Sequence, residues 1–445
     1  MKVTLVEPAM IKRQGVSEKP SWVLQPLSLA TLAGMTPPGV EVQAVDDRIE
    51  AIDYDEPRDL VGISVKTFTA RRAYQIAAEF RQRGVPVILG GHHPTLLPEE
   101  AGRHADALLL GEAEGVWDTV LADVRRGRLQ PLYRQPESLA RQPLAAVRVD
   151  RSIFAGKKYL PVGMVESTRG CPFACNFCSV TTFFGRSFRH RPPQEVAAEV
   201  AGLGKKFVFL VDDNIVGDKE AAKQLFRALI PLRIRWISQA SLTMTRDREL
   251  MRLMRDSGCA GVLVGIETLQ RDNLKQIRKG WNTVGIGYDQ ALDIARDHGV
   301  AVVGSFILGM DQDTEESLDV LLDFAIRQRL FAVLFNLLTP YPGTELYETF
   351  RAQGRLAKPR WWDDPDYTYG SLVFEPTGIS GEALARKRLQ MYRDFYGGSS
   401  LLRRFCEPRA NARDLWHAFT FLAMNLPANR EEAMRYGQAL GAAEA

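Results

Sequence analysis

The chain has 445 residues, and its 57 Lys and Arg residues nearly balance its 54 Asp and Glu residues, which leaves a formal net charge of +3. This balance gives no reason to expect a nucleic acid as partner, and a hydrophobic content of 45% is enough to bury cores, which excludes a disordered or fibrous protein. At roughly 150 residues per domain, the length predicts about two to four domains.

Neither a membrane span nor a signal peptide is expected. The longest apolar runs, near residues 300–310 and 330–338, fall well short of the ~18 residues that a membrane helix needs. The apolar run at the N-terminus is short and meets an acid at Glu7. A reducing, cytoplasmic setting is the simplest interpretation, and it tolerates free thiols and an oxygen-sensitive centre.

Residues 1–125 alternate short β-branched runs with helical patterns, which is typical of a parallel sheet built from βαβ units. One helical pattern covers residues 69–83, where apolar residues recur at helical spacing. We therefore expect an α/β, doubly wound, flavodoxin-like domain whose ligand lies beyond the carboxyl ends of its strands. The expected strands are residues 3–6, 40–45, 60–64, 85–89 and 107–110.

The chain beyond residue 125 divides into a linker, a second α/β region and a helical tail. Residues 126–160 contain scattered prolines and no sustained period, so we expect a linker there. Residues 161–354 hold six βα units, two fewer than a closed (β/α)8 barrel has, which favours a partial, open barrel. Residues 355–445 carry helical patterns near 380–396 and 415–426, and we expect a helical cap over the substrate region. The expected barrel strands are residues 163–166, 207–211, 236–240, 261–266, 302–308 and 331–338, followed by a helix over 344–353.

Three of the five cysteines, Cys171, Cys175 and Cys178, lie just after the first expected barrel strand, at the functional rim of such a barrel. Three thiolates on one tight loop are able to hold three irons of a [4Fe-4S] cluster, which leaves the fourth iron free to bind an amine and a carboxylate. A structural zinc site with His190 as fourth ligand is the main alternative, but zinc sites favour paired C-x2-C knuckles. The cysteine spacing therefore favours an iron-sulfur cluster.

The remaining cysteines, Cys259 and Cys406, are too few for a second cluster. Cys259 precedes an expected barrel strand, which favours a place in the core. Cys406 follows Arg403 and Arg404, but a packed thiol in a helix is the simpler interpretation. One cluster is therefore the most that we expect this chain to hold.

The cysteine motif C-x3-C-x-aromatic-C, with Phe177 as its aromatic residue, resembles the signature of the radical S-adenosylmethionine (SAM) superfamily, whose core is a partial (β/α)6 barrel. The resemblance implies a [4Fe-4S] cluster and SAM as cofactors. It implies that Asp212 or Asp213 contacts the amino group of SAM and that Glu267 contacts its ribose, while capping of a helix near residue 219 is the alternative for the aspartates. The implied SAM-site residues are Phe177, Asp212, Asp213, Ser238, Glu267, Gly304 and Gly309.

A flavodoxin-like domain ahead of such a barrel resembles the cobalamin-binding class of radical SAM enzymes. Glycine-rich segments follow three expected strands, at residues 62–64, 90–95 and 111–112, and glycines let the backbone lie flat against a corrin and its nucleotide tail. No D-x-H-x-x-G motif occurs, so the sequence gives no sign of the histidine that replaces the nucleotide base on cobalt in other cobalamin proteins. For His92 and His93, approach to the cofactor and a hydrogen bond within the loop both stay open. The alternative is a domain that kept its shape and lost its cofactor. The implied cobalamin-site residues are Ser64, Gly90, Gly91, His93, Thr95, Gly111 and Glu112.

The resemblance implies an enzyme that transfers a methyl group to an unactivated carbon of a small-molecule metabolite through a 5′-deoxyadenosyl radical, with an electron from a flavodoxin or ferredoxin. One alternative is a radical SAM cyclase, rearrangement or non-methyl transfer reaction. A second alternative is a non-catalytic iron-sulfur or cobalamin carrier. The aromatic and basic residues of the expected cap are compatible with an aromatic, lipid or anionic substrate, and equally with ordinary helix packing and a solvated basic face.

Overall fold

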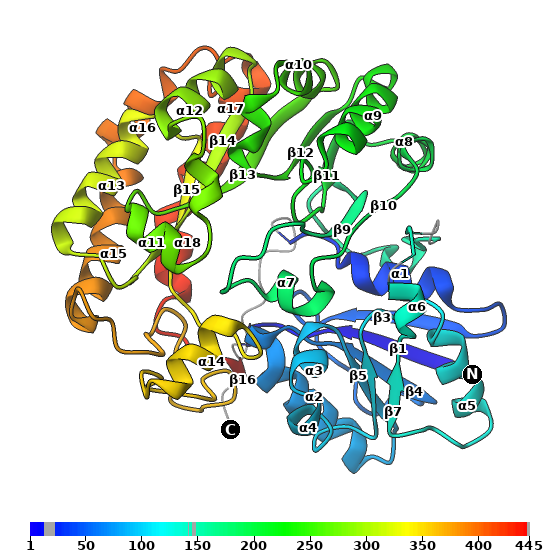
Figure 1. The fold of residues 1–445 in the computed structure, drawn as a ribbon. Helices are drawn as coiled ribbons and strands as arrows, with labels where there is room; N and C mark the ends of the chain where they lie inside the picture. The colour runs from blue at the N-terminus through cyan, green and yellow to red at the C-terminus, as the bar shows by residue number, and fades with distance from the viewer. Residues whose placement is uncertain (13–22, 141, 145–147, 443–445) are drawn as a thin grey trace.

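The computed structural model describes residues 1–12, 23–140, 142–144 and 148–442, and these residues contain two six-stranded parallel sheets, one in each half of the chain. Figure 1 shows the N-terminal sheet with its helices in blue and cyan, and the second sheet in green and yellow, with the orange and red C-terminal helices alongside it. The predicted α/β class is confirmed. Within the described residues, no helix has the length and apolar character needed to cross a membrane.

The N-terminal sheet has six parallel strands in the order β3-β1-β4-β5-β6-β7. Its first five strands follow the flavodoxin-like order, so the connection reverses between β1 and β4, and ligands bind beside such a reversal. Successive residues of each strand point to opposite faces, so two cores form: β1 and β4 bury Val6 and Ile63 on the side of α2 (Ala70–Gln82), and Leu5 and Leu60 on the other. The strands are β1 (Lys2–Glu7), β3 (Glu41–Asp46), β4 (Leu60–Ser64), β5 (Val87–Gly90), β6 (Ala107–Leu110) and β7 (Leu132–Arg134).

Several short strands were not predicted, among them β7, β2 (Ile11–Lys12) and β16 (Gly441–Ala442). β7 lies within residues 126–160, where the sequence reading expected only a linker, and it extends the sheet beside β6. β2 pairs in parallel with β16 from the far end of the chain. Strands of two or three residues are too short to show a period, which is why composition and patterning missed them.

The second sheet has six parallel strands in the order β15-β14-β13-β12-β11-β8. β8 and β15 form its two edges, so this is the open, partial barrel that the sequence predicted. Asp218, Asp247 and Thr314 accept hydrogen bonds from the first turns of the helices that follow them, and these caps set where each helix begins. The strands are β8 (Gly163–Val165), β11 (Phe207–Leu210), β12 (Arg235–Ala240), β13 (Cys259–Glu267), β14 (Ala301–Leu308) and β15 (Ala332–Leu337), and the capped helices are α9 (Lys219–Leu229), α10 (Arg248–Asp256) and α13 (Glu315–Arg327).

An antiparallel hairpin interrupts the barrel after β8. It is made of β9 (Thr168–Gly170) and β10 (Phe188–His190), and the segment between them carries the cysteines and α7 (Ser179–Phe184). α7 packs against α3 (His92–Leu96) of the N-terminal half, where the rings of His92 and Phe183 lie 4.3 Å apart. The cysteine segment therefore lies beside the N-terminal domain, as Figure 1 shows.

The C-terminal residues form helices over the last barrel strands. The two predicted helices are confirmed as α15 and α17, whereas α16 and α18 were not predicted. Trp361 and Trp362, in the loop ahead of these helices, contact the N-terminal domain at Phe68 and His93, with ring centroids 4.8 and 5.6 Å apart. The region therefore touches both halves of the chain. The helices are α14 (Glu345–Ala352), α15 (Gly381–Phe395), α16 (Gly398–Phe405), α17 (Leu415–Asn425) and α18 (Ala428–Arg435).

Candidate functional site

Cys171, Cys175 and Cys178 lie together on the segment between β9 and α7. All three thiols are free and partly buried. Among the described residues, no three His, Cys, Asp or Glu side chains converge on a position that one metal ion would occupy. In a [4Fe-4S] cluster each thiolate binds its own iron, so the donor set needs three thiols around a shared space rather than a shared point. The donor set therefore fits a cluster with one open iron.

The segment after β11 holds the start of the cysteine hairpin in place through hydrogen bonds. Asp212 is fully buried, and its carboxylate accepts hydrogen bonds from the backbone N–H groups of Ser167 and Thr168 at 2.8 and 2.6 Å and from the Ser167 hydroxyl at 2.6 Å. Burial raises the pKa of Asp212 to about 7 despite these bonds. Both carboxylate oxygens of Asp212 accept hydrogen bonds from the chain itself, so Asp212 fixes the turn that leads into β9.

Asp213 and Asn214 lie closer to the cysteines. Asp213 accepts a hydrogen bond from the Gly170 N–H at 3.1 Å through Oδ2, and burial raises its pKa to about 6. Its Oδ1 makes no hydrogen bond with the described part of the chain, so of the two aspartates it is the one with capacity for a ligand. The Asn214 amide donates to the sulfur of Cys171 at 3.9 Å and accepts from the Ser241 N–H. The sequence reading did not select Asn214, although it directly follows the two aspartates.

The open mouth of the barrel holds a cavity of about 360 Å³, here called the barrel-mouth cavity. Glu267 ends β13 in a left-handed conformation, with φ +66°, and its carboxylate folds back to pair with Lys279 at 2.6 Å. A side chain at Gly265 would collide with this carboxylate, so the glycine permits the fold-back. The lining residues are Phe68, Phe177, Glu267, Ser305, Ile307, Asn336, Leu337, Leu338, Thr339, Tyr341, Tyr367, Tyr369, Gly370, Ser371 and Arg388.

Of the residues that the resemblance assigned to the SAM site, Phe177 and Glu267 line this cavity, and Asp212, Asp213, Ser238, Gly304 and Gly309 do not. The last three have other contacts. Ser238 is buried and donates its hydroxyl to the Leu210 carbonyl at 2.7 Å. Gly304 alternates with the cavity-lining Ser305, so it faces the opposite side, where a Cβ would meet Leu330 at 2.8 Å. Gly309 has φ +96° and packs against α15 of the C-terminal region. Hydrogen bonding and close packing explain all three.

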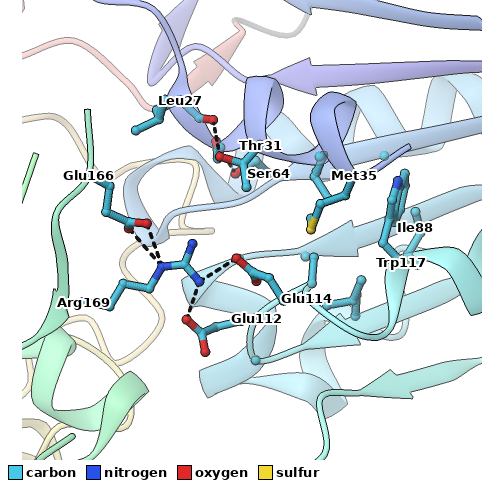
Figure 2. Close-up of a pocket in the computed structure, with 18 of the residues that line it drawn as sticks. Leu27, Thr31, Met35, Ser64, Ile88, Glu112, Glu114, Trp117, Glu166 and Arg169 are labelled. Atoms are coloured by element: carbon cyan, nitrogen blue, oxygen red, sulfur yellow. Dashed lines mark hydrogen bonds and ion pairs between the residues drawn. The ribbon is translucent and has the colours of Figure 1, made fainter. Parts of the chain in front are cut away.

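A second cavity, of about 320 Å³, lies between α1 (Leu27–Met35) and the carboxyl ends of β4, β5 and β6, and is here called the crevice cavity. Figure 2 shows Thr31 of α1 beside Ser64, and Met35 of the same helix beside Ile88 and Trp117. Its wall includes the predicted Ser64, Gly90, Gly91, Gly111 and Glu112, while Glu166, Arg169, Phe184 and Val211 come from the barrel. Both domains therefore build this cavity, beside the reversal of the flavodoxin-like sheet.

The glycines of the crevice cavity have separate causes. Gly91 and Gly111 adopt φ +101° and +81°, a region that favours glycine, and a Cβ at Gly91 would meet the Val65 backbone at 3.0 Å. A Cβ at Gly90 would meet nothing closer than 3.6 Å, so the missing side chain there leaves free space in the cavity. Turns explain Gly91 and Gly111, whereas Gly90 keeps the crevice open. A flat ring system fits such a glycine-walled, mainly apolar crevice, so the residues present fit a cobalamin tail.

His93 and Thr95, which the resemblance also assigned to the cobalamin site, do not line the crevice cavity. His93 is fully buried, with its ring nitrogens 3.4 Å from the Thr67 hydroxyl and 3.0 Å from the Tyr74 hydroxyl. Thr95 donates its hydroxyl to the Gly91 carbonyl and accepts from the Gly111 N–H at 3.0 Å. Thr95 therefore links the turns at Gly91 and Gly111, whereas the ring of His93 is held by neighbouring polar side chains.

A cluster of buried charges joins the two domains at one wall of the crevice cavity. Arg169, two residues before Cys171, lies 2.6 Å from Glu112, 2.7 Å from Glu114 and 2.9 Å from Glu166. Figure 2 shows its guanidinium between the Glu166 carboxylate and those of Glu112 and Glu114. Arg189 of β10 binds the same Glu112 at 2.7 Å. Burial alone would raise the pKa of Glu112, but these two arginines hold it below its ordinary value. Glu112 is therefore a bridge between the domains as well as part of the cavity wall.

Two family models match the chain. The one described as Radical SAM superfamily matches residues 165–325, and the one described as B12 binding domain matches residues 18–121. The bacteriochlorophyllide d C-12(1)-methyltransferase of Chlorobaculum tepidum is 32% identical over 395 residues, which cover 86% of this chain and 85% of the relative. The bacteriochlorophyllide d C-8(2)-methyltransferase of the same organism is 31% identical over 403 residues, which cover 86% and 88%.

A solved structure shares the fold. It is the radical SAM methyltransferase TsrM from Kitasatospora setae, determined with cobalamin and a [4Fe-4S] cluster bound. It matches with a TM-score of 0.62 at 19% identity, over 79% of this chain and 75% of that one. The two family models and these likenesses agree with the division into a crevice-bearing N-terminal half and a cysteine-bearing barrel.

Proposed function

The chain belongs to the cobalamin-binding radical SAM enzymes, and we propose that it methylates an unactivated carbon of a small organic molecule. The observation that carries this proposal is the shared wall between the two candidate sites. Arg169 lines the crevice cavity and lies two residues before Cys171, so a corrin in the crevice and a cluster on the cysteine loop would be neighbours. Methyl transfer needs both cofactors close to one substrate, whereas a carrier of either cofactor needs no such proximity.

The residues present fit the cofactors of this family. Cys171, Cys175 and Cys178 would hold the cluster. Phe177, Asp213 and Glu267 would contact SAM, and Ser64, Gly90, Gly91, Gly111 and Glu112 would surround part of cobalamin. When bound, the cluster and SAM supply a radical that removes hydrogen from carbon, and cobalamin supplies the methyl group.

Several side chains of this chain would orient and shield the reacting groups. Phe173, inside the cysteine segment, stacks on Trp281 with ring centroids 3.6 Å apart and excludes water from that side of the loop. Lys279 lies above the same Trp281 ring and fixes the Glu267 carboxylate, which is thereby positioned to accept hydrogen bonds from ribose hydroxyls. The Asn214 N–H faces the sulfur of Cys171, where it would stabilise the thiolate.

We also propose a cytoplasmic location and a flavodoxin-type or ferredoxin-type electron donor. The support for both is chemical. The cysteine loop is free of disulfides, and the cluster that it would hold is oxygen-sensitive and needs one electron at low potential for each SAM cleaved.

Product analysis tests the proposed function. The anaerobically purified protein with cobalamin is incubated with methyl-deuterated SAM, a reductant and a metabolite extract, and the products are quantified by mass spectrometry. Methylation predicts S-adenosylhomocysteine and 5′-deoxyadenosine in equal amounts, with deuterated methyl groups in one extracted compound. 5′-Deoxyadenosine alone would instead support a cyclisation, rearrangement or other transfer, and the absence of both products would contradict an enzymatic role.

A further inference from the structure

Arg388, on α15, lines the barrel-mouth cavity with an unused hydrogen-bond donor. The residue is only 4% exposed. Its Nε donates to the Phe335 carbonyl at 2.8 Å and its Nη2 donates to Glu432 of α18, but Nη1 has no partner in the described part of the chain. A buried N–H without a partner destabilises a fold, because it has lost its hydrogen bond to water. Because Arg388 lines the cavity, a ligand bound there is the candidate partner for Nη1.

The cavity wall around Arg388 is rich in other donors. Tyr341, Tyr367 and Tyr369 line it, and none of their hydroxyls makes a hydrogen bond with any residue that the structure describes. Burial raises the pKa of Tyr341 and Tyr367, so both hydroxyls stay protonated at neutral pH. The carboxylate of the cavity, Glu267, is already paired with Lys279. Arg388 is itself paired with Glu432, so the wall beside it offers a ligand hydrogen-bond donors: the three tyrosine hydroxyls and the Nη1 of Arg388.

Aromatic rings form the remaining wall. Phe68 of the N-terminal domain lies edge-on to Tyr341 and Tyr369, with ring centroids 5.9 and 6.2 Å apart. Rings in this arrangement present flat faces and edges to a planar guest, which they bind by offset stacking or edge contacts. The wall thus combines a planar apolar surface with a buried guanidinium.

We propose that Arg388 anchors a carboxylate of a planar, conjugated substrate in the barrel-mouth cavity. This inference rests on the proposed function, because it names the class of molecule that the enzyme would methylate. The carboxylate supplies the acceptor that Nη1 lacks, and the Tyr367 and Tyr369 hydroxyls are placed to donate to its second oxygen. Arg388 is therefore a residue that determines specificity and positions the substrate for a reaction centred on the cysteine loop.

The test uses two probes of the same shape, 2-naphthoate and the neutral 2-naphthamide, titrated calorimetrically into the anaerobically purified holoenzyme with SAM bound. The wild type is expected to bind 2-naphthoate about tenfold more tightly than 2-naphthamide or better, since a hydrogen bond to a charged group contributes about 1.5–3 kcal/mol. Arg388→Gln is expected to abolish this preference. Equal affinity of the wild type for both probes, or a preference that survives Arg388→Gln, would overturn the proposal.

Two further variants separate binding from folding. Tyr369→Phe removes a hydroxyl that makes no hydrogen bond with the described residues, so we expect the fold to be kept and 2-naphthoate binding to weaken about threefold. Arg386→Gln, an exposed site on the same helix that pairs with Glu382, is the matched control and is expected to keep the wild-type preference. If Tyr369→Phe binds 2-naphthoate as tightly as the wild type does, the donor wall does not hold a carboxylate.

The methionine carboxylate of SAM is the other possible source of the anion, and the experiment distinguishes it. The titration is therefore repeated without SAM. If Arg388 binds SAM, 2-naphthoate binds more tightly in the absence of SAM and Arg388→Gln weakens SAM binding, which overturns the substrate assignment. Failure of the proposed function is separate, because it would appear as a wild-type protein that forms no 5′-deoxyadenosine from SAM under reducing conditions, whatever it does with the naphthyl probes.

Discussion

At the scale of single residues, the buried carboxylate of Asp212 sets the turn that carries the chain from β8 into the cysteine hairpin. Its three hydrogen bonds from Ser167 and Thr168 are local to the barrel rim. The sequence predicted an aspartate at this rim but left the choice between Asp212 and Asp213 open, because both follow the same strand. Their hydrogen bonds distinguish the two. Both oxygens of Asp212 accept hydrogen bonds, whereas Oδ1 of Asp213 accepts none from the described residues.

Asp212→Asn is expected to change the pH dependence of stability. Between the ordinary value of 3.8 and about 7, the folded chain retains a proton that the unfolded chain releases, so the contribution of Asp212 is greatest at low pH and is lost as pH rises through 7. Asparagine reproduces the hydrogen bonds of the protonated form without titrating. The stability of D212N relative to the wild type should therefore rise between pH 4 and 7, by on the order of 2 kcal/mol, and then level off.

Thermal unfolding midpoints of the anaerobically purified proteins, measured from pH 5 to 8, check this expectation. Asp118→Asn, at an exposed position of α5 (Trp117–Arg125), is the control and should track the wild type at every pH. A D212N curve parallel to the wild-type curve over this range would show that Asp212 does not hold a raised pKa.

Ser305 and Arg388 could not be predicted from the sequence, for one physical reason. Ser305 and Gly304 are neighbours on β14, and only the register of the strand decides which of them faces the cavity. Arg388 lies in a helix far from the motifs, and its unpaired Nη1 is visible only once Phe335 and Glu432 are seen to occupy the other nitrogens. Motif spacing identifies a loop; the direction of each side chain depends on packing.

At the scale of elements, both cavities lie at the carboxyl ends of parallel strands. The five predicted strands of the N-terminal sheet and the six of the barrel were found because each is a buried apolar run with helical patterns on either side. Capping residues such as Asp218 set the following helices, so helix starts were close to expectation. β7, β2 and β16 were missed because their pairing depends on long-range contacts and not on any local period.

Gly90→Val is expected to close the crevice cavity. Gly90 ends β5, and an added Cβ would meet only Leu109 in ordinary contact at 3.6 Å, so the strand accepts a valine whose methyl groups project into the crevice. Cobalamin bound per chain should fall about tenfold or more, as a filled pocket cannot admit the tail, while the iron content stays at the wild-type level. Cobalamin and iron analyses of the purified proteins measure both quantities.

Gly202→Ala, where an added Cβ meets nothing within 4 Å, is the matched control for this experiment. It should retain the wild-type cobalamin content. If G90V binds as much cobalamin as this control does, the cofactor lies outside the crevice cavity.

At the scale of the whole molecule, the two domains meet through charge and aromatic contacts. Glu112 and Arg169 are 57 positions apart in the chain yet form a buried ion pair, and Phe68 of the N-terminal domain completes the barrel-mouth cavity. The order of domains was readable from the sequence, since motifs and periods identify each half. Their mutual placement was not, because neither half shows by itself which of its charges will be paired across the interface.

Glu112→Gln is expected to weaken the interface. Breaking a buried ion pair by removing one partner destabilises a protein by about 3–5 kcal/mol, and this change leaves Arg189 without its carboxylate. Urea unfolding should show a loss near the lower end of that range, because Arg169 keeps Glu114 and Glu166. Glu382→Gln, which breaks the exposed pair with Arg386, should change stability by less than about 1 kcal/mol. An E112Q protein as stable as E382Q would mean that the charge cluster does not hold the domains together.

The most direct test of the central claim, that this one chain brings a single cluster and a corrin together, is the visible spectrum of the anaerobically purified protein produced with cobalamin, combined with iron and cobalamin analysis. We expect both a cluster band and a corrin band, with about four irons and about one cobalamin per chain. A cluster band without a corrin band would contradict the account, because the shared wall of the crevice cavity and the cysteine loop would then serve no methyl transfer.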